Sequence, residues 1–124
     1  MLSHLSLGVR DLTRSKTFYA AVLDALGCVE VWSADTAAGY GRAGGNDKLA
    51  LFERGGDDRL AAGPGFHLAF AAPNQRAVHR FYEAAMAHGG TDAGEPGLRP
   101  HYGDTYYAAF VLDPDGHKLE VVHQ

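Results

Sequence analysis

The sequence predicts an α+β fold built from two copies of one β-α-β-β-β unit, and three observations support this prediction. The segment "HLSLGVRDLTRSKTFYAAVLDALG" from His4 overlies "HLAFAAPNQRAVHRFYEAAMAHGG" from His67, and further on "KLALF" from Lys48 overlies "KLEVV" from Lys118. The bridge "RGGDDRLAAGPG" between the copies is rich in glycine and charge, as is typical of a connecting loop. We therefore expect one domain, residues 1–124, with modules at 1–58 and 64–124.

The first copy begins with a predicted strand over residues 2–9, where apolar residues recur along "LSHLSLGV". A helix is expected next, with Asp11 as its N-cap and Gly27 at its end. Its apolar stripe at helical spacing consists of Leu12, Tyr19, Val22, Leu23 and Leu26. Strand-like runs at about 28–34, 37–42 and 47–54 complete this copy.

The second copy follows the same order. A strand is expected over "GFHLAFAA", and Asn74 is the predicted cap of a helix that stops at Gly89 and Gly90. Strand-like runs follow at about 91–95, 105–112 and 117–123. The turn "LDPDGHK" joins the last two runs, because Asp-Gly strongly favours a tight turn.

Two histidines occupy equivalent positions in the two copies. Side chains alternate between the faces of a strand, so His4 shares a face with Ser6, and His67 shares a face with Ala69. Each imidazole therefore lies on the side with the smaller residues. Either histidine alone is explained as an ordinary core or edge residue, but their equivalence in the repeat favours a shared function.

Glu120 lies on the closing strand, on the face opposite Leu119 and Val121. Alone it reads as a surface glutamate on an edge strand. Two imidazoles and one carboxylate are nevertheless a set that can hold a borderline divalent cation and leave positions open for substrate or water.

Composition excludes several classes of function. The formal charge is −4 and the pI is near 5.9, so there is no basic surface for nucleic acid or anionic lipid. No apolar run is long enough to span a membrane, and the start of the chain does not resemble a signal peptide. The lone Cys28 forms no internal disulfide. We expect a cytoplasmic protein that binds neither membranes nor nucleic acid.

The chain resembles the vicinal oxygen chelate superfamily, which includes glyoxalase I, extradiol dioxygenases, fosfomycin-resistance thiol transferases, methylmalonyl-CoA epimerase and bleomycin resistance proteins. The resemblance rests on the segment from His4 quoted above, on "GFHLAF" and on "AFVLDPDGHKLEVV". It implies curved mixed sheets that form an open barrel, a homodimer, and one divalent metal ion per site, such as Zn, Ni, Fe, Mn or Co. The resemblance also implies that the metal ligands are His4, His67 and Glu120, which occupy the ligand positions of this family.

Departures from the family leave the reaction subtype open. Glyoxalase I and the epimerase place a fourth ligand where this chain has Ala50, and strand alternation turns Glu53 to the other face. Extradiol dioxygenases carry a tyrosine where this chain has Phe110. The thiol transferases share the His-His-Glu set, but no potassium or phosphonate loop is recognisable.

The insertion "GEPGLRPHYGDTYYAAF" in the second copy concentrates polar and aromatic residues. His101 is a candidate acid or base, as is Glu120. The candidate substrate-binding residues from the insertion and from a facing wall are Arg99, Tyr102, Tyr106, Tyr107, Trp32, Arg42 and Phe52.

Two functions follow from the resemblance. The first is a metal-dependent enzyme, of lyase or isomerase, dioxygenase or thiol-transferase type, that acts on a small substrate with adjacent oxygens. The second is a metal-free protein that binds and sequesters a small molecule, such as an antibiotic, in the manner of bleomycin resistance proteins. The presence of all three candidate ligands favours the enzyme.

Overall fold

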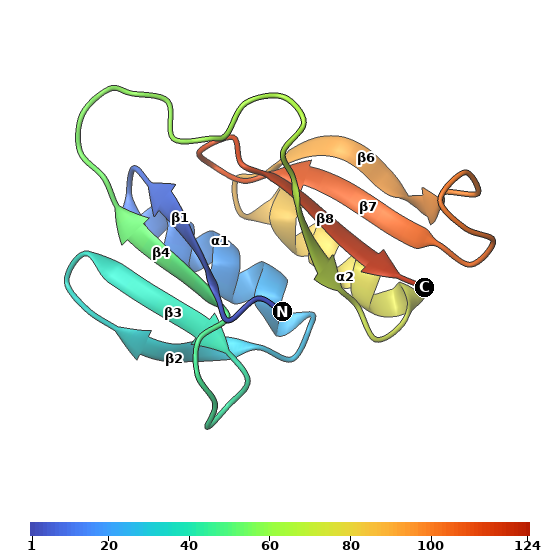
Figure 1. Ribbon diagram of the computed structural model, residues 1–124, viewed down its shortest axis with the longest axis horizontal. Helices are drawn as coiled ribbons and strands as arrows, with labels where there is room; N and C mark the ends of the chain where they lie inside the picture. Colours follow the sequence, from blue (N-terminus) through green and yellow to red (C-terminus); the bar gives the residue numbers. More distant parts are fainter.

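Two four-stranded mixed sheets, each with one helix on its back, make up the computed structural model, which describes residues 1–124 (Figure 1). The first sheet has the order β1-β4-β3-β2, and its elements are β1 Leu5–Val9, α1 Leu12–Asp24, β2 Val29–Ser33, β3 Ala37–Gly41 and β4 Leu49–Glu53. The second has the order β5-β8-β7-β6, and its elements are β5 Leu68–Ala71, α2 Gln75–Ala87, β6 Thr91–Leu98, β7 Tyr107–Leu112 and β8 Lys118–His123. The α+β class and the repeated β-α-β-β-β order are as predicted.

Both helices begin at the predicted caps. The Asp11 side chain accepts a hydrogen bond from the Arg14 backbone N–H at 3.1 Å, and Asn74 Oδ1 accepts one from Ala77 at 2.8 Å. Such bonds satisfy N–H groups that have no partner within the helix. Gly27 follows the end of α1 with φ of 74°, a left-handed conformation that glycine adopts without strain. Neither helix is long and apolar enough to cross a membrane.

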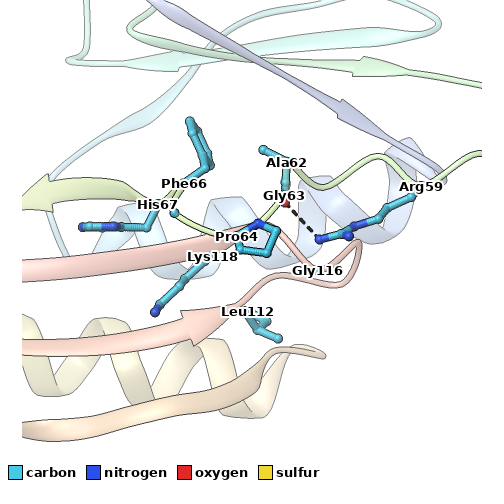
Figure 2. Close-up of a pocket in the computed structure, with 10 residues that line it drawn as sticks. Arg59, Ala62, Gly63, Pro64, Phe66, His67, Leu112, Gly116 and Lys118 are labelled. Carbon is cyan, nitrogen blue, oxygen red and sulfur yellow. Dashed lines mark hydrogen bonds between the residues drawn. The ribbon is translucent and has the colours of Figure 1, made fainter.

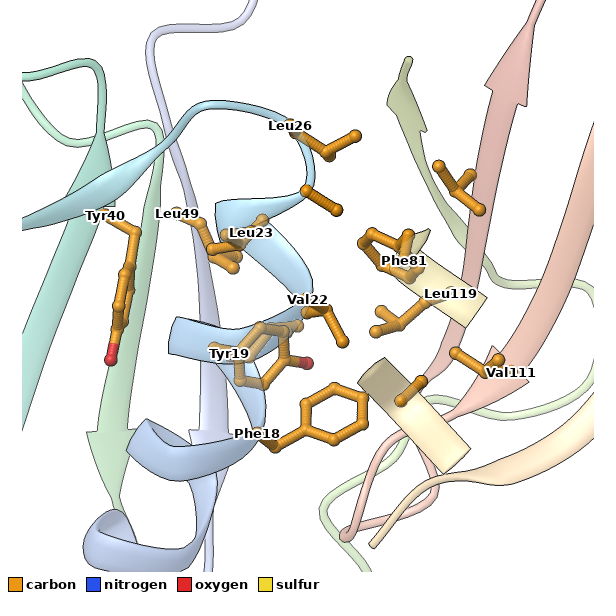
Figure 3. Packing of buried hydrophobic residues seen from close by; sticks show 14 of the residues in the cluster. Phe18, Tyr19, Val22, Leu23, Leu26, Tyr40, Leu49, Phe81, Val111 and Leu119 are labelled. Carbon is orange, nitrogen blue, oxygen red and sulfur yellow. The ribbon is translucent and has the colours of Figure 1, made fainter. Parts of the chain in front are cut away.

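Helix α1 connects the two units through one hydrophobic core. Figure 3 shows Phe18 and Val22 on the side of α1 that faces Phe81 of α2, while Leu23 lies on the side of Leu49 in the first sheet. All five side chains are buried. Removal of this apolar surface from water is the main force that holds the two units together.

No strand pairing joins the two sheets, so the open barrel that the family resemblance implied is not closed within one chain. β1 is an edge strand of the first sheet and β5 an edge strand of the second, and no backbone hydrogen bonds join them. The units meet instead through α1, α2 and a turn, so both edge strands keep unpaired backbone groups.

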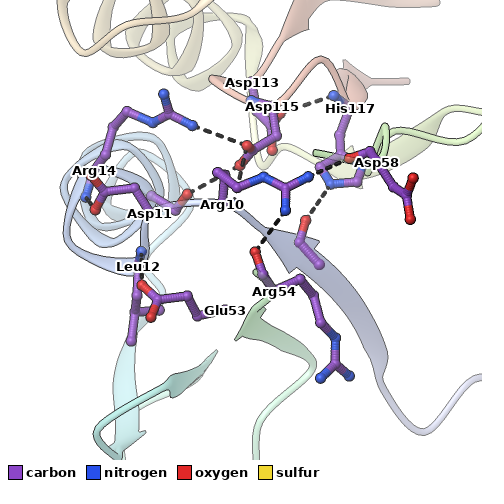
Figure 4. A network of polar contacts seen from close by, with 12 residues as sticks. Arg10, Asp11, Leu12, Arg14, Glu53, Arg54, Asp58, Asp113, Asp115 and His117 are labelled. Atoms are coloured by element: carbon purple, nitrogen blue, oxygen red, sulfur yellow. Dashed lines mark hydrogen bonds and ion pairs between the residues drawn. The ribbon is translucent and has the colours of Figure 1, made fainter. Parts of the chain in front are cut away.

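The β7–β8 turn, residues 113–117, docks on the first unit (Figure 4). The Asp115 carboxylate accepts hydrogen bonds from the Arg10 backbone N–H at 3.2 Å and from the Arg14 guanidinium at 3.0 Å. His117 Nε2 lies 2.8 Å from the Gly8 carbonyl oxygen and donates to it. This turn therefore sets the orientation of the second unit relative to β1 and α1.

Asp113 is the buried centre of the same turn. Its Oδ2 accepts a 2.6 Å hydrogen bond from the Tyr19 hydroxyl, and its Oδ1 accepts bonds of 2.9 Å from the backbone N–H groups of Asp115 and His117. Burial raises the pKa of Asp113, although the hydrogen bonds oppose the shift. Burial and the nearby Asp113 carboxylate also raise the pKa of Tyr19, which keeps its hydroxyl a donor.

Candidate functional site

Glu120 is a buried carboxylate in the middle of the second sheet. It lies on β8 between Ala69 of β5 and Phe110 of β7, and the residue is only 2% exposed. Its neighbours Leu119 and Val121 point into the hydrophobic core, so alternation turns Glu120 to the face away from α2. A buried carboxylate is costly unless it is paired, and its partners therefore identify the site.

Both carboxylate oxygens of Glu120 have a partner. Oε1 lies 2.9 Å from His67 Nε2, and Oε2 accepts a hydrogen bond from the Tyr106 hydroxyl. The His67 ring itself is partly open to solvent, with 44% of its side chain exposed. Burial, the hydrogen bond and the Glu120 charge raise the pKa of Tyr106 to about 12, so this hydroxyl remains a donor at neutral pH.

A cavity of about 370 Å³ adjoins this pair, and several predicted site residues line it: His67, Arg99, His101 and Tyr102. The rings of His101 and Tyr102 lie 4.1 Å apart, and those of Tyr102 and Tyr106 lie 5.2 Å apart, measured between centroids. The insertion in the second copy therefore provides one wall of the cavity.

Two predicted substrate-binding residues lie elsewhere. The Tyr107 hydroxyl is 2.5 Å from His79 Nε2 on α2, because Tyr107 shares the helix-facing side of β7 with the buried Ala109. Arg42 lines a cavity of about 130 Å³ together with Cys28, near the end of α1. Within one chain neither residue lines the same cavity as Arg99, so their part in substrate binding stays a prediction.

Trp32 and Phe52 form an aromatic patch on the first sheet, with ring centroids 6.3 Å apart. The indole lies directly on Gly39, where an added Cβ would come within 2.0 Å of Nε1. Gly39 pairs with Ala50, which occupies in the first sheet the place that Glu120 has in the second. Neither aromatic residue lines the cavities next to His67.

Glu53 faces α1, as strand alternation predicts. Its Oε2 accepts a 2.9 Å hydrogen bond from the Leu12 backbone N–H in the first turn of that helix. Ala50, on the opposite face of β4, offers no donor atom. The first sheet therefore supplies no carboxylate at the position equivalent to Glu120.

His4 is apart from the His67–Glu120 pair. It is exposed just before β1, its Nδ1 lies 3.0 Å from Ser3 Oγ, and it lines a cavity of about 200 Å³ with Leu68. No group of three His, Cys, Asp or Glu side chains within the chain is close enough to hold a metal ion. One chain thus brings together two of the three predicted ligands.

Sequence reasoning missed Lys118 as a site residue. Its Nζ lies 5.3 Å from the centroid of the Phe110 ring, and Arg99 Cζ lies 5.7 Å from the same centroid. The signal was available, because Lys118 precedes Glu120 by two residues on one strand and so shares its face.

Known proteins share the sequence and the fold. Residues 1–121 match the family model described as the Glyoxalase/Bleomycin resistance protein/Dioxygenase superfamily. A probable lactoylglutathione lyase from Synechocystis sp. is 31% identical over 130 residues, which cover 98% of this chain and 93% of that protein.

Solved structures agree with this match. A glyoxalase/bleomycin resistance protein from Albidiferax ferrireducens is 33% identical and superposes with a TM-score of 0.86 over 100% of this chain and 99% of the other. The fosfomycin resistance protein FosX from Mesorhizobium loti, 22% identical, shares the fold with a TM-score of 0.72 over 100% of this chain and 92% of that one. The chain belongs to the glyoxalase/bleomycin resistance protein/dioxygenase superfamily.

Proposed function

We propose that this protein is an enzyme that uses a divalent metal ion and acts on a small substrate with adjacent oxygens. The observation that carries the proposal is the His67–Glu120 pair, in which a buried carboxylate lies 2.9 Å from a partly exposed imidazole beside a cavity. Imidazole nitrogen and carboxylate oxygen are the ligands that Zn²⁺ and similar cations accept in open sites. The donor set therefore fits such an ion.

We infer that the third ligand is His4 of a second copy of the chain. Within one chain His4 does not join His67 and Glu120, and the outer edges of the edge strands β1 and β5 have no strand partner. A two-fold dimer that sets the first unit of one copy against the second unit of the other would cover these edges. The homodimer is thus part of the proposal.

The bound cation would polarise adjacent substrate oxygens and stabilise an enolate or oxyanion, an effect worth several kcal/mol. Side chains of the protein orient the ligand carboxylate and exchange protons with the substrate. Tyr106 fixes the orientation of Glu120 through its hydrogen bond to Oε2. His101, which is exposed beside Tyr102, is placed to exchange a proton with a substrate in the cavity.

Among the reaction types of the superfamily we favour a lyase or isomerase. The relative from Synechocystis is a probable lactoylglutathione lyase, which supports this class. Because Ala50 provides no fourth ligand and no base, we expect the proton transfer to depend on Glu120 or His101 and the substrate to differ from that of glyoxalase I.

A metal-free binding protein is the second candidate. The observation in its favour is that His67 and Glu120 satisfy each other without any third ligand nearby. In that case the cavity would hold a small molecule, such as an antibiotic, without converting it.

Elemental analysis and titration calorimetry on protein purified without an affinity tag separate the two candidates. We expect one divalent ion per chain in the wild type, and little in His67→Ala or in His4→Ala. The matched control is His88→Ala, because His88 is an exposed histidine at the end of α2. Equal metal content in the wild type and His67→Ala would contradict the metal site, whereas metal binding followed by turnover in a substrate screen would exclude the sequestering protein.

A further inference from the structure

We propose that the site selects an anionic substrate, and that Lys118 and Arg99 hold its carboxylate or phosphonate group. This inference rests on the proposed function, because it names the substrate class of the same site. It concerns side chains other than the candidate metal ligands and is tested separately from them.

Cationic side chains line the two cavities next to His67. One cavity of about 370 Å³ and another of about 470 Å³ share His67 and Lys118 in their linings. Arg99 lines the first cavity and Arg59 the second, and neither cavity is lined by Asp or Glu. The whole chain carries more acidic residues (15) than basic ones (11). The charged residues that line these two cavities are all basic, so the charge of the linings is opposite in sign to the net charge of the chain.

Lys118 has no carboxylate partner. The ion pairs of the chain involve the cations Arg14, Lys16, Arg80 and His67. Lys118 Nζ instead lies over the Phe110 ring at 5.3 Å from its centroid, a cation–π contact that attracts the charge without neutralising it. Its positive charge therefore remains available to a ligand.

Arg99 is held in place by neutral groups. Its guanidinium donates to the carbonyl oxygens of Glu95 at 2.8 Å and Gly97 at 3.1 Å, and its Cζ lies 5.7 Å from the centroid of Phe110. Two cations therefore approach one aromatic ring from within one cavity, and they repel each other. An anion bound by Lys118 and Arg99 would remove this repulsion, and the guanidinium retains further N–H donors for the oxygens of a carboxylate or phosphonate.

Arg59 is less well placed for this role. Its guanidinium donates to the Ala62 carbonyl oxygen at 3.0 Å, and Figure 2 shows it on one side of Pro64 while His67 and Lys118 lie on the other. Lys118 and Arg99 line the same cavity as His67, so an oxyanion held by them would lie in the cavity that the imidazole of the His67–Glu120 pair adjoins. A cavity of about 370 Å³ suits a small molecule rather than a polymer.

The test is an NMR titration of the protein with methylphosphonate, with acetate and with neutral acetamide as the uncharged comparison. We expect the two anions to shift resonances of residues around Lys118 and acetamide to shift none, with the tighter of the two anions identifying the preferred group. Lys118→Gln and Arg99→Gln should each weaken anion binding about tenfold or more. Arg76→Gln, on the exposed surface of α2, should leave it unchanged.

Wild-type affinity for both anions in Lys118→Gln, or equal binding of acetamide, would overturn the inference. Thermal unfolding of each variant verifies that it is folded, and the exposed Lys118 carries the test if Arg99→Gln does not fold. Metal content is measured on the same samples and should be unchanged in Lys118→Gln. If the wild type holds no metal, the proposal of a metal-dependent enzyme is wrong. The effect of Lys118→Gln on anion binding still tests whether the site selects an anion.

Discussion

Replacing Asp113 with alanine is expected to destabilise the protein, because this buried carboxylate joins the β7–β8 turn to α1. The substitution removes three hydrogen bonds, from Tyr19 at 2.6 Å and from the backbone N–H groups of Asp115 and His117 at 2.9 Å each. It also leaves the Tyr19 hydroxyl without an acceptor in the hydrophobic core, where Tyr19 is 0% exposed.

The expected magnitude follows from these contacts. Hydrogen bonds to a charged group contribute about 1.5–3 kcal/mol each. Removal of the buried charge recovers part of this energy, since desolvation is also the largest cause of the raised pKa of Asp113. We expect a net loss of about 2–4 kcal/mol in the free energy of unfolding, which lowers Tm by ~8–16 °C in a chain of this size.

Two matched variants make the measurement specific. Asp113→Asn retains an acceptor for the two backbone N–H groups and can donate to the Tyr19 oxygen, so it should cost about 1 kcal/mol. Asp57→Ala removes an exposed loop carboxylate and should leave Tm unchanged. Calorimetric unfolding of all three variants decides the matter, and a Tm of Asp113→Ala equal to that of Asp57→Ala would refute the role of this turn.

The same residue predicts a pH dependence. Because burial raises the pKa of Asp113, the folded protein binds a proton at a higher pH than the unfolded chain, whose value is near 3.8. The stability of the wild type relative to Asp113→Asn should therefore increase as the pH falls from the raised folded value to 3.8, and then level off. A difference that decreases with falling pH would contradict this reasoning.

Four further predictions concern the site and the assembly. Tyr106→Phe removes the hydrogen bond to Glu120 Oε2 and should weaken metal affinity about 10-fold to 100-fold by calorimetry, whereas an unchanged affinity would mean that Tyr106 does not position the carboxylate. Glu53→Gln should retain full metal affinity while Glu120→Gln loses it, because Glu53 binds the start of α1; equal losses would place Glu53 at the metal. The wild type should turn over the glutathione hemithioacetal of methylglyoxal at well below ~10 per second, and faster turnover would show that the absence of a donor at Ala50 does not prevent that reaction. Light scattering at micromolar concentration should give about twice the chain mass of 13.2 kDa, and a monomer would exclude His4 of a second copy as the third ligand.

The features that the sequence predicted best are local or repeated. The caps Asp11 and Asn74 bond to backbone groups three residues away, so their role depends on nothing distant in the chain. The internal repeat located the strands, and alternation along β8 placed Glu120 opposite the core-facing Leu119 and Val121.

The contacts that were not predicted involve partners distant in the chain. Alternation turns the adjacent Tyr106 and Tyr107 to opposite faces, but their partners, Glu120 for Tyr106 and His79 of α2 for Tyr107, depend on how the elements pack. Arg42 follows the last residue of β3, and its long side chain turns toward Gly27 at the end of α1, a contact that no periodicity encodes. The family resemblance implied an open barrel, and within one chain the outer edges of β1 and β5 pair with no further strand.

The two copies have kept one backbone plan and diverged in the chemistry of their open faces. Where the second sheet has Glu120 beside Phe110, the first has Ala50 beside Gly39, and the Trp32 indole fills the space that a side chain at position 39 would need. One sheet therefore presents a charged, hydrogen-bonded group, and the other presents a flat aromatic surface. In the proposed dimer the second sheet of one copy faces the first sheet of the other, so each site would combine a polar wall that holds reacting oxygens with an apolar wall that excludes water. Within one chain these two open faces belong to separate sheets that share no strand pairing.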